Sequence, residues 1–251
     1  MRELTLTALP GIPEIEPGAP LAELLLAAVE RAGKRLEAGD VLVVAQKIVS
    51  KAEGRMVRLA EVTPTPLARQ LGERVGIDPA LAELVLRESQ EVLRVRPGIL
   101  IVQHRLGLVM ANGGVDQSNL PGEAAALLLP EDPDASARRI QVDLKRACGA
   151  DVGVVVNDSF GRAWRNGVTG VAIGLSGIPG LVDLRGQPDR NGRQLRVTQV
   201  GAADELAAAA SLVMGQADEG LPAVLARGFP HARRAGSATE LLRPRAEDLF
   251  R

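Results

Sequence analysis

The sequence predicts an α+β protein in which helices pack against mixed or antiparallel sheets. Two short apolar runs rich in valine, residues 41–44 and 152–156, have the length and composition of buried strands. Two longer stretches, residues 21–36 and 202–214, have helical patterns, the first amphipathic and the second rich in alanine. Helices and strands follow one another without a strict alternating repeat, which favours this class over a doubly wound parallel fold.

Residues 64–75 and 78–92 predict a helical hairpin after the first strand. The second helix of the pair opens at Asp78, an N-cap residue that is followed by proline at the first helical position. Residues 98–103 and 106–111 then predict a β-hairpin, whose second strand leads into a polar loop that contains glycine.

The second half of the chain begins with a helix predicted over residues 132–148. Asp132 is its N-cap and Pro133 stands at its first helical position. The strand at residues 152–156 follows, and we expect it to end at the polar residues 157–159. The remaining candidates are strands at residues 168–175, 195–200 and 224–227 and the helix at residues 202–214.

The composition indicates one folded unit. Of 251 residues, 46% are apolar, which is enough to bury a large core. Lys and Arg number 30 against 31 Asp and Glu, so neither nucleic acid nor an anionic membrane is an expected partner. We expect a single domain over residues 1–251, because no linker or repeat divides the chain.

One local group of arginines stands within that neutral average. Its members are Arg162, Arg165, Arg185, Arg190 and Arg193. They would suit one small anionic ligand, or they form a solvated face, and the pattern leaves both interpretations open.

A reducing compartment fits the cysteine content. Cys148 is the single cysteine and cannot form an intramolecular disulfide. No secretory start segment is recognisable, and no apolar run approaches ~18 residues. We therefore expect a cytoplasmic protein.

The common nucleotide-binding and hydrolase motifs are absent from the sequence. It contains no Gly-x-x-x-x-Gly-Lys-Ser/Thr loop and no Gly-x-Gly-x-x-Gly after a strand. Only His104 and His231 are available, which argues against a histidine-rich metal site or a Ser-His-Asp triad.

Carboxylates in polar loops at strand ends are the remaining candidates for chemistry. Asp116 with Asn119, and Asp158 with Ser159, offer the oxygen ligands that Mg²⁺ or Mn²⁺ takes together with nucleotide phosphates. For either aspartate alone, an ordinary turn residue is an equal interpretation. Lys51 after the first strand would suit a phosphate, although a solvated lysine is the commoner case. The loop at residues 215–222 is, by itself, better explained as a helix end than as a phosphate cradle.

Several blocks of sequence resemble the coenzyme F420-0:L-glutamate ligase family. They are Gly-Ile-Pro-Glu-Ile at residues 11–15, Ile-Val-Ser-Lys-Ala-Glu-Gly-Arg at 48–55, Gly-Val-Asp-Gln-Ser-Asn at 114–119, Asn-Asp-Ser-Phe-Gly-Arg at 157–162 and Ala-Ile-Gly at 172–174. Their order and spacing match from near the N-terminus to about residue 228. The resemblance is to the stand-alone form of that family, without a C-terminal flavin reductase domain.

The resemblance implies a two-subdomain α+β fold, an intertwined homodimer and a GTP-dependent ligase. The γ-phosphate of GTP would activate the carboxylate of coenzyme F420-0, and the amine of L-glutamate would attack the acyl phosphate. The implied product is F420-1 with a γ-linked glutamate and then longer tails, with GDP and phosphate released. Mg²⁺ or Mn²⁺, with two ions at the site, and K⁺ are the implied cations.

The same resemblance assigns roles to residues of this chain. It implies that Asp116, Asp158 and Arg162 act in catalysis, Arg162 on a substrate phosphate or carboxylate, and that Asp116, Asp158, Ser159 and Gln216 are the metal positions. The implied nucleotide-contacting residues are Ile12, Pro13, Glu14, Ile15, Gln46, Lys47, Lys51, Asn119, Gly215, Gln216, Ala217, Asp218, Glu219, Gly220, Leu221 and Pro222.

This chain departs from the family pattern in two places. Gln46 and Lys47 replace a small hydroxyl pair, and residues 216–219 replace a Gly-rich acidic stretch, so Lys47 is expected to add a phosphate contact. Two other functions stay open on the sequence alone. One is a nucleotide-dependent carboxylate-amine ligase for another acceptor, and the other is a non-catalytic deazaflavin- or nucleotide-binding module, although buried carboxylates beside an anion do not favour a pure binding role.

Overall fold

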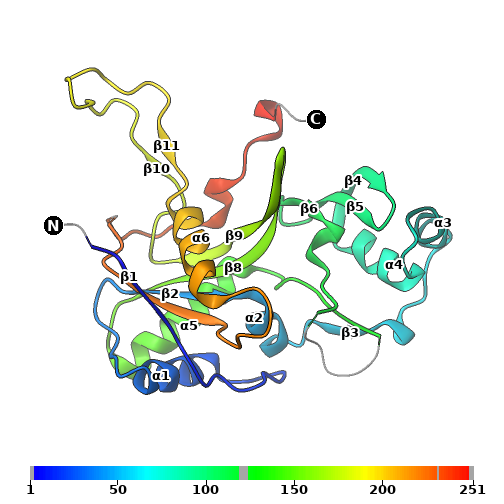
Figure 1. Cartoon of the computed structure of the whole chain (residues 1–251), viewed down its shortest axis with the longest axis horizontal. Helices are drawn as coiled ribbons and strands as arrows, with labels where there is room; N and C mark the ends of the chain where they lie inside the picture. The colour runs from blue at the N-terminus through cyan, green and yellow to red at the C-terminus, as the bar shows by residue number, and fades with distance from the viewer. Residues whose placement is uncertain (1–2, 119–123, 231, 249–251) are drawn as a thin grey trace.

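The computed structural model describes residues 3–118, 124–230 and 232–248. Within them, the chain folds around a five-stranded sheet in the order β1-β12-β2-β8-β9 (Figure 1). Only β2 and β8 run parallel in this sheet, and its other neighbours pair antiparallel. The mixed sheet confirms the predicted α+β class. Its strands are β1 (Thr5–Ala8), β2 (Val41–Ala45), β8 (Gly153–Arg162), β9 (Arg165–Ser176) and β12 (Ala223–Arg227).

Helices cover both faces of the sheet. Helices α1 (Leu21–Arg31) and α5 (Pro133–Cys148) pack on one face and α6 (Ala202–Met214) on the other (Figure 1). Leu42 and Val44 of β2 belong to the core under α1 and α5, whereas Val41 and Val43 belong to the core under α6. Because both faces of β2 are buried, its sequence is a continuous apolar run, and this is why the strand was predictable.

Helix α2 (Gln46–Ala52) is an element that the sequence did not predict. It begins directly after β2, and no side chain caps its N-terminus. A helix this short has neither a capping residue nor enough turns to show a periodic apolar pattern. Because α2 continues directly from β2, its first residues lie at the end of a central strand of the sheet.

A second group of elements lies beside the sheet. It contains α3 (Pro66–Val75), α4 (Pro79–Arg87) and a three-stranded antiparallel sheet of β4 (Ser89–Arg96), β5 (Ile99–His104) and β6 (Val109–Ala111). The predicted helical hairpin and β-hairpin are confirmed. The predicted end of the helix over residues 78–92 was wrong. The helix stops at Arg87, and Val92 pairs with Val102 in the sheet. Cross-strand pairing outweighs the helical pattern there.

Two short antiparallel pairs are the remaining strands among the described residues. β3 (Met56–Arg58) pairs with β7 (Ala125–Leu127), and β10 (Val182–Asp183) pairs with β11 (Gln199–Val200). The strand expected over residues 195–200 is therefore confined to Gln199–Val200. None of the helices in the described ranges has both the length and the apolar content needed to cross a membrane.

Glu88 joins the second group of elements to the segments beside the main sheet. Its Oε2 atom lies 3.0 Å from Arg55 Nη2, 3.2 Å from Arg105 Nε and 3.4 Å from His104 Nε2. Burial alone would raise the pKa of Glu88, but the His104 imidazole and the charges of Arg105 and Arg55 hold this pKa at about 2. Arg55 also donates to the backbone carbonyl of Leu129 before α5, so one carboxylate connects several elements.

Glu88→Gln is expected to lower the free energy of unfolding by about 3 kcal/mol at pH 7. The folded-state pKa of about 2 lies below the ordinary value of 4.5, so this stabilisation is complete above pH 4.5 and is lost as the pH falls toward 2. Urea unfolding at pH 7 and at pH 3 would measure this loss. The difference in free energy of unfolding between the variant and the wild-type protein should be smaller at pH 3. Glu91→Gln, which removes a partly exposed carboxylate of β4 that pairs with Arg245, is the control and should change little. An equal loss from Glu88→Gln at both pH values would contradict the electrostatic explanation.

Candidate functional site

A cavity of about 630 Å³ lies at the carboxyl end of β2. β2 and β8 are parallel, with Ala45 at the end of β2 opposite Asn157, and β8 continues past this point to Arg162. Most residues that were predicted to bind nucleotide or metal line this cavity. They are Ile12, Pro13, Glu14, Ile15, Gln46, Lys47, Lys51, Asp116, Asp158, Ser159, Gly215, Gln216, Ala217, Asp218, Glu219, Gly220, Leu221 and Pro222.

Asp116 is held at the cavity by Lys47 and Ser118. Lys47 Nζ lies 2.8 Å from Asp116 Oδ2 and donates to Ser118 Oγ at 2.6 Å. The backbone N–H and the hydroxyl of Ser118 both donate to Asp116 Oδ1, at 2.7 and 2.8 Å. Burial opposes ionisation of Asp116, but the hydrogen bonds from Lys47 and Ser118 outweigh it and hold its pKa below the usual range. Asp116 is therefore an ionised, fixed carboxylate.

Asp158 lies inside β8, and the prediction that the strand ends before it was wrong. Asp158 pairs with Val171 and Ser159 with Gly170, beyond a register shift after Val156. Burial raises the pKa of Asp158 to about 6, and the charge of Asp116 adds to this rise. The Ser159 N–H donates to Asp158 Oδ1 at 2.9 Å but does not offset it. The ionised form of Asp158 is therefore energetically unfavourable unless a cation binds next to it.

The oxygen donors at this point fit a hard divalent cation. Asp116 and Asp158 supply carboxylates that repel each other, Ser159 supplies a hydroxyl, and Gln216 supplies an amide oxygen in the same lining. Mg²⁺ and Mn²⁺ favour such ligands and complete their coordination with water and phosphate oxygens. In the described ranges, no group of three or more His, Cys, Asp or Glu side chains could hold a metal without such help.

The loop after α6 forms another wall of the cavity. Gly215 has φ 77°, and a Cβ atom at this position would collide with the Glu219 carboxylate. That carboxylate accepts a hydrogen bond from the N–H of Ala217 at 2.8 Å, and the backbone N–H groups of Ala217, Glu219 and Gln216 lower its pKa. The loop thus points backbone N–H groups at an anion, which is the property that a phosphate-binding loop requires. Lys51 and Glu14 also line the cavity, and Lys51 Nζ lies 2.5 Å from Glu14 Oε1.

Asn157 is a site residue that the sequence reasoning did not single out. It is buried, lines the cavity, and its Nδ2 atom donates to Ser211 Oγ of α6 at 3.2 Å. Asn157 therefore joins β8 to the helix that leads into the 215–222 loop. Its place directly before Asp158 in a family motif was the available signal. The other lining residues that were not predicted are Ala45, Ile48, Ser118 and Met214.

Of the other two predicted residues, one lies outside the described residues and one is not brought to this cavity. Asn119 lies outside the described residues. Arg162 is exposed at the end of β8 and is not part of the lining, so its catalytic role stays a prediction. The group of five arginines is also not one cluster. Arg162 and Arg165 belong to the β8–β9 hairpin, whereas Arg185 and its neighbours belong to the separate projection between β10 and β11 (Figure 1).

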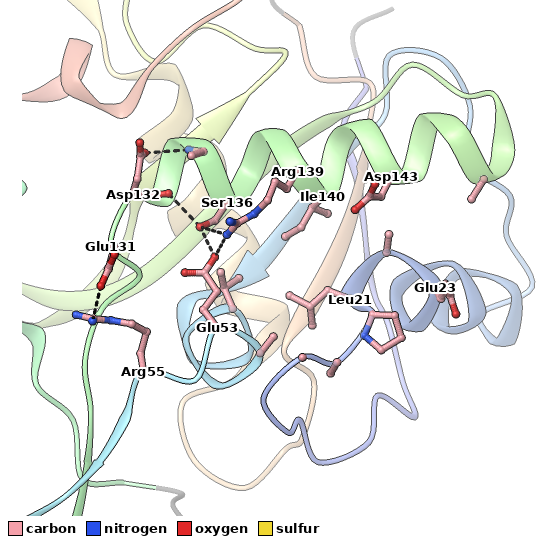
Figure 2. A pocket seen from close by; sticks show the side chains of 18 of the residues that line it. Leu21, Glu23, Glu53, Arg55, Glu131, Asp132, Ser136, Arg139, Ile140 and Asp143 are labelled. Atoms are coloured by element: carbon pink, nitrogen blue, oxygen red, sulfur yellow. Dashed lines mark hydrogen bonds and ion pairs between the residues drawn. The ribbon is translucent and has the colours of Figure 1, made fainter.

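A larger cavity of about 890 Å³ lies between α1, α5 and the end of α2. Figure 2 shows Glu53 and Arg139 pointing toward each other across it, and Ser136 Oγ donates to Glu53 Oε1 at 2.5 Å. Arg146 pairs with Asp143 at its rim. None of the residues predicted for nucleotide or metal lines this cavity. We therefore place the candidate active site in the strand-end cavity.

Paired carboxylates, lysines and a loop whose N–H groups face an anion give the cavity at the end of β2 the features of a candidate enzyme site. A family model described as F420-0:Gamma-glutamyl ligase matches residues 11–228. The chain belongs to this family, and it is a ligase.

Three relatives that are similar in sequence over most of the chain support this assignment. A coenzyme F420:L-glutamate ligase of Methanothermobacter thermautotrophicus is 45% identical over 250 residues, which cover 99% of either chain. One from Methanopyrus kandleri is 48% identical over 242 residues, 95% of this chain and 94% of that protein. A third, from Halobacterium salinarum, is 45% identical over 236 residues, 92% and 89% of the two chains.

Proposed function

We propose that this chain joins L-glutamate to the carboxylate of coenzyme F420-0 in a GTP-dependent reaction. The observation that supports it best is the strand-end cavity, which gathers every described residue that family resemblance assigns to nucleotide or metal. The names of the relatives, coenzyme F420:L-glutamate ligase, supply the substrate class.

The proposed reaction proceeds through an acyl phosphate. A carboxylate oxygen of the acceptor attacks the γ-phosphorus of GTP, and GDP leaves with the bond electrons. The amine of glutamate then attacks the acyl carbon, loses a proton, and phosphate leaves. Both partners of the first step are anions, so the site must reduce their repulsion and align them.

Residues of the cavity have the properties that these steps require. Asp116, Asp158 and Ser159 would hold Mg²⁺ or Mn²⁺, which when bound supplies positive charge for the phosphates. Lys47 and Lys51 add ammonium groups, and the N–H groups of Gln216, Ala217 and Glu219, which face the Glu219 carboxylate, would suit phosphate oxygens. The N-terminal segment of Ile12, Pro13, Glu14 and Ile15 also lines the cavity.

The test is to incubate the purified protein with coenzyme F420-0, L-glutamate, GTP and Mn²⁺ and to analyse the deazaflavin by mass spectrometry. A glutamyl mass increment that requires GTP supports the proposal and counts the residues added. Product formation with ATP alone would contradict the GTP dependence. No increment with any nucleotide would contradict the reaction.

Lys51→Ala is expected to raise the KM for GTP by about tenfold to a hundredfold and to leave the KM for glutamate nearly unchanged. The reason is that a charged hydrogen bond to phosphate contributes about 1.5–3 kcal/mol. Steady-state kinetics with each substrate varied in turn measures both constants. Lys34→Ala removes a lysine from the exposed segment after α1 and serves as the matched control. An unchanged KM for GTP in Lys51→Ala would remove Lys51 from the nucleotide site.

We also propose the homodimer and the cytoplasmic location that the family resemblance implies. Trp164 at the turn between β8 and β9 is 87% exposed and Val168 nearby is 56% exposed, so this hairpin presents apolar surface to a second copy. Sedimentation equilibrium that gives the mass of one chain at micromolar concentration would contradict the dimer.

A further inference from the structure

Lys47 places a positive charge directly beside Asp116. It is the second residue of α2, and it reaches Asp116 Oδ2 and Ser118 Oγ at 2.8 and 2.6 Å. The Lys47 and Asp116 side chains are 30% and 26% exposed, so this ion pair is partly withdrawn from water. A lysine on a neighbouring turn, Lys51, contacts Glu14 instead, so the two ammonium groups of α2 have different positions at the cavity.

The hydrogen bonds of Asp116 limit how many cations it can bind. An ionised carboxylate has about four lone-pair positions. Oδ1 accepts from the N–H and the hydroxyl of Ser118, and Oδ2 accepts from Lys47. One position on Oδ2 is left. Asp116 can therefore coordinate one metal ion while Lys47 is in place, but it cannot bridge two.

Asp158 offers the other open oxygen. Its Oδ1 accepts from the N–H of Ser159, and no hydrogen bond to Oδ2 is recorded among the described residues. The formal charges of Asp116, Asp158 and Lys47 sum to a single negative charge. One divalent ion on Asp158 and on the open position of Asp116 would complete a positively charged centre for phosphates, with the ammonium as its second cation.

We propose that Lys47 takes the place of one divalent cation, so that the site holds a single Mg²⁺ or Mn²⁺ ion between Asp116 and Asp158. This inference rests on the proposed function of the cavity, and it differs from the two ions that family resemblance implies. A primary ammonium is a compact point charge with three donors, which suits it to contact a carboxylate and a phosphate oxygen together.

The experiment counts Mn²⁺ ions per chain by electron paramagnetic resonance in the presence of saturating GDP. We expect one ion for the wild-type protein and two for Lys47→Met, because the variant frees Asp116 Oδ2 and removes a repelling charge. Lys47→Arg keeps the charge and should bind one ion. Lys51→Met changes the other lysine of α2 and should also bind one ion. A second neutral variant, Lys47→Gln, repeats the test if Lys47→Met does not fold, as judged by circular dichroism.

Two ions in the wild-type protein, or one ion in both neutral variants, would overturn the inference. The first Mn²⁺ is also expected to bind at least about tenfold more tightly to Lys47→Met, since a positive charge beside the ion is removed. The measurement needs no turnover. If no glutamyl product forms but the counts are one and two, the proposed reaction fails while Lys47 remains the substitute cation.

Discussion

Asp158→Asn is expected to lower the rate of glutamyl transfer on the order of 10³-fold while it makes the folded protein more stable at neutral pH. The loss of rate follows from removing a charge that would bind the metal next to the reacting phosphate. The gain in stability follows from the pKa of Asp158, which is about 6 in the folded chain against an ordinary value of 3.8. At pH 7 the folded protein must keep this carboxylate ionised, at a cost of about 1–3 kcal/mol.

The stability gain of Asp158→Asn is expected to depend on pH. A raised pKa means that the folded state binds the proton more tightly than the unfolded state, so the cost disappears below pH 3.8 and is complete above about pH 6. Urea unfolding should therefore show Asp158→Asn to be more stable than wild type at pH 7 and nearly equal to it at pH 4. Asp143→Asn, a half-exposed carboxylate at the other cavity, is the control for both measurements. Near-normal turnover in Asp158→Asn would refute the proposed metal contact, and a loss of stability at pH 7 would refute the assigned pKa.

Gly170→Ala is expected to destabilise the protein by about 3 kcal/mol and to reduce turnover by about a hundredfold. Gly170 lies on β9 opposite Ser159, and a Cβ atom there would collide with the Ser211 hydroxyl and with the backbone carbonyl of Ala207 in α6. The backbone of α6 cannot yield as a flexible side chain would. The helix must therefore shift, and the loop that begins at Gly215 shifts with it.

Gly161→Ala is the matched control for this change. Gly161 belongs to the same β8–β9 hairpin, a Cβ atom there meets nothing within 4 Å, and its φ is not positive. Thermal unfolding and steady-state kinetics of both variants measure the two effects. A Gly170→Ala protein with wild-type stability would show that α6 does not pack as closely on β9 as the structure has it. Normal turnover despite reduced stability would separate α6 from the geometry of the loop.

Two strands of the central sheet, β2 and the first half of β8, were predictable because they are buried on both faces, whereas the more exposed strand β1 was not predicted. Residues 41–44 and 152–156 form continuous apolar runs. In the folded protein, pairing with neighbouring strands extends the second of these strands beyond its apolar run. Asp158 was placed in a loop because Asn, Asp and Ser are common turn residues. Pairing of β8 with β9 overrides that preference, and it depends on residues that follow in the chain, so the local sequence did not show it.

The candidate site was predictable in its composition but not in its contacts. Motif resemblance identified Asp116, Asp158 and the 215–222 loop, which are distant in sequence and line one cavity in the structure. The contact of Lys47 with Asp116 was missed, because it depends on α2 starting directly after β2. The arginine group was misleading for the opposite reason. Nearness along the chain suggested a cluster, but two hairpins separate its members.

The hydrogen bond from Asn157 to Ser211 has a consequence for how the site can open. Asn157 belongs to a central strand and Ser211 to a helix on a buried core, so local unfolding of either would expose much apolar surface. The loop at residues 215–222 is anchored at its first end by this pair and at its second end by β12. We therefore expect opening motions of this loop to be confined to its middle. Asp158, next to Asn157 on β8, is then carried on a part of the molecule that we expect to open last.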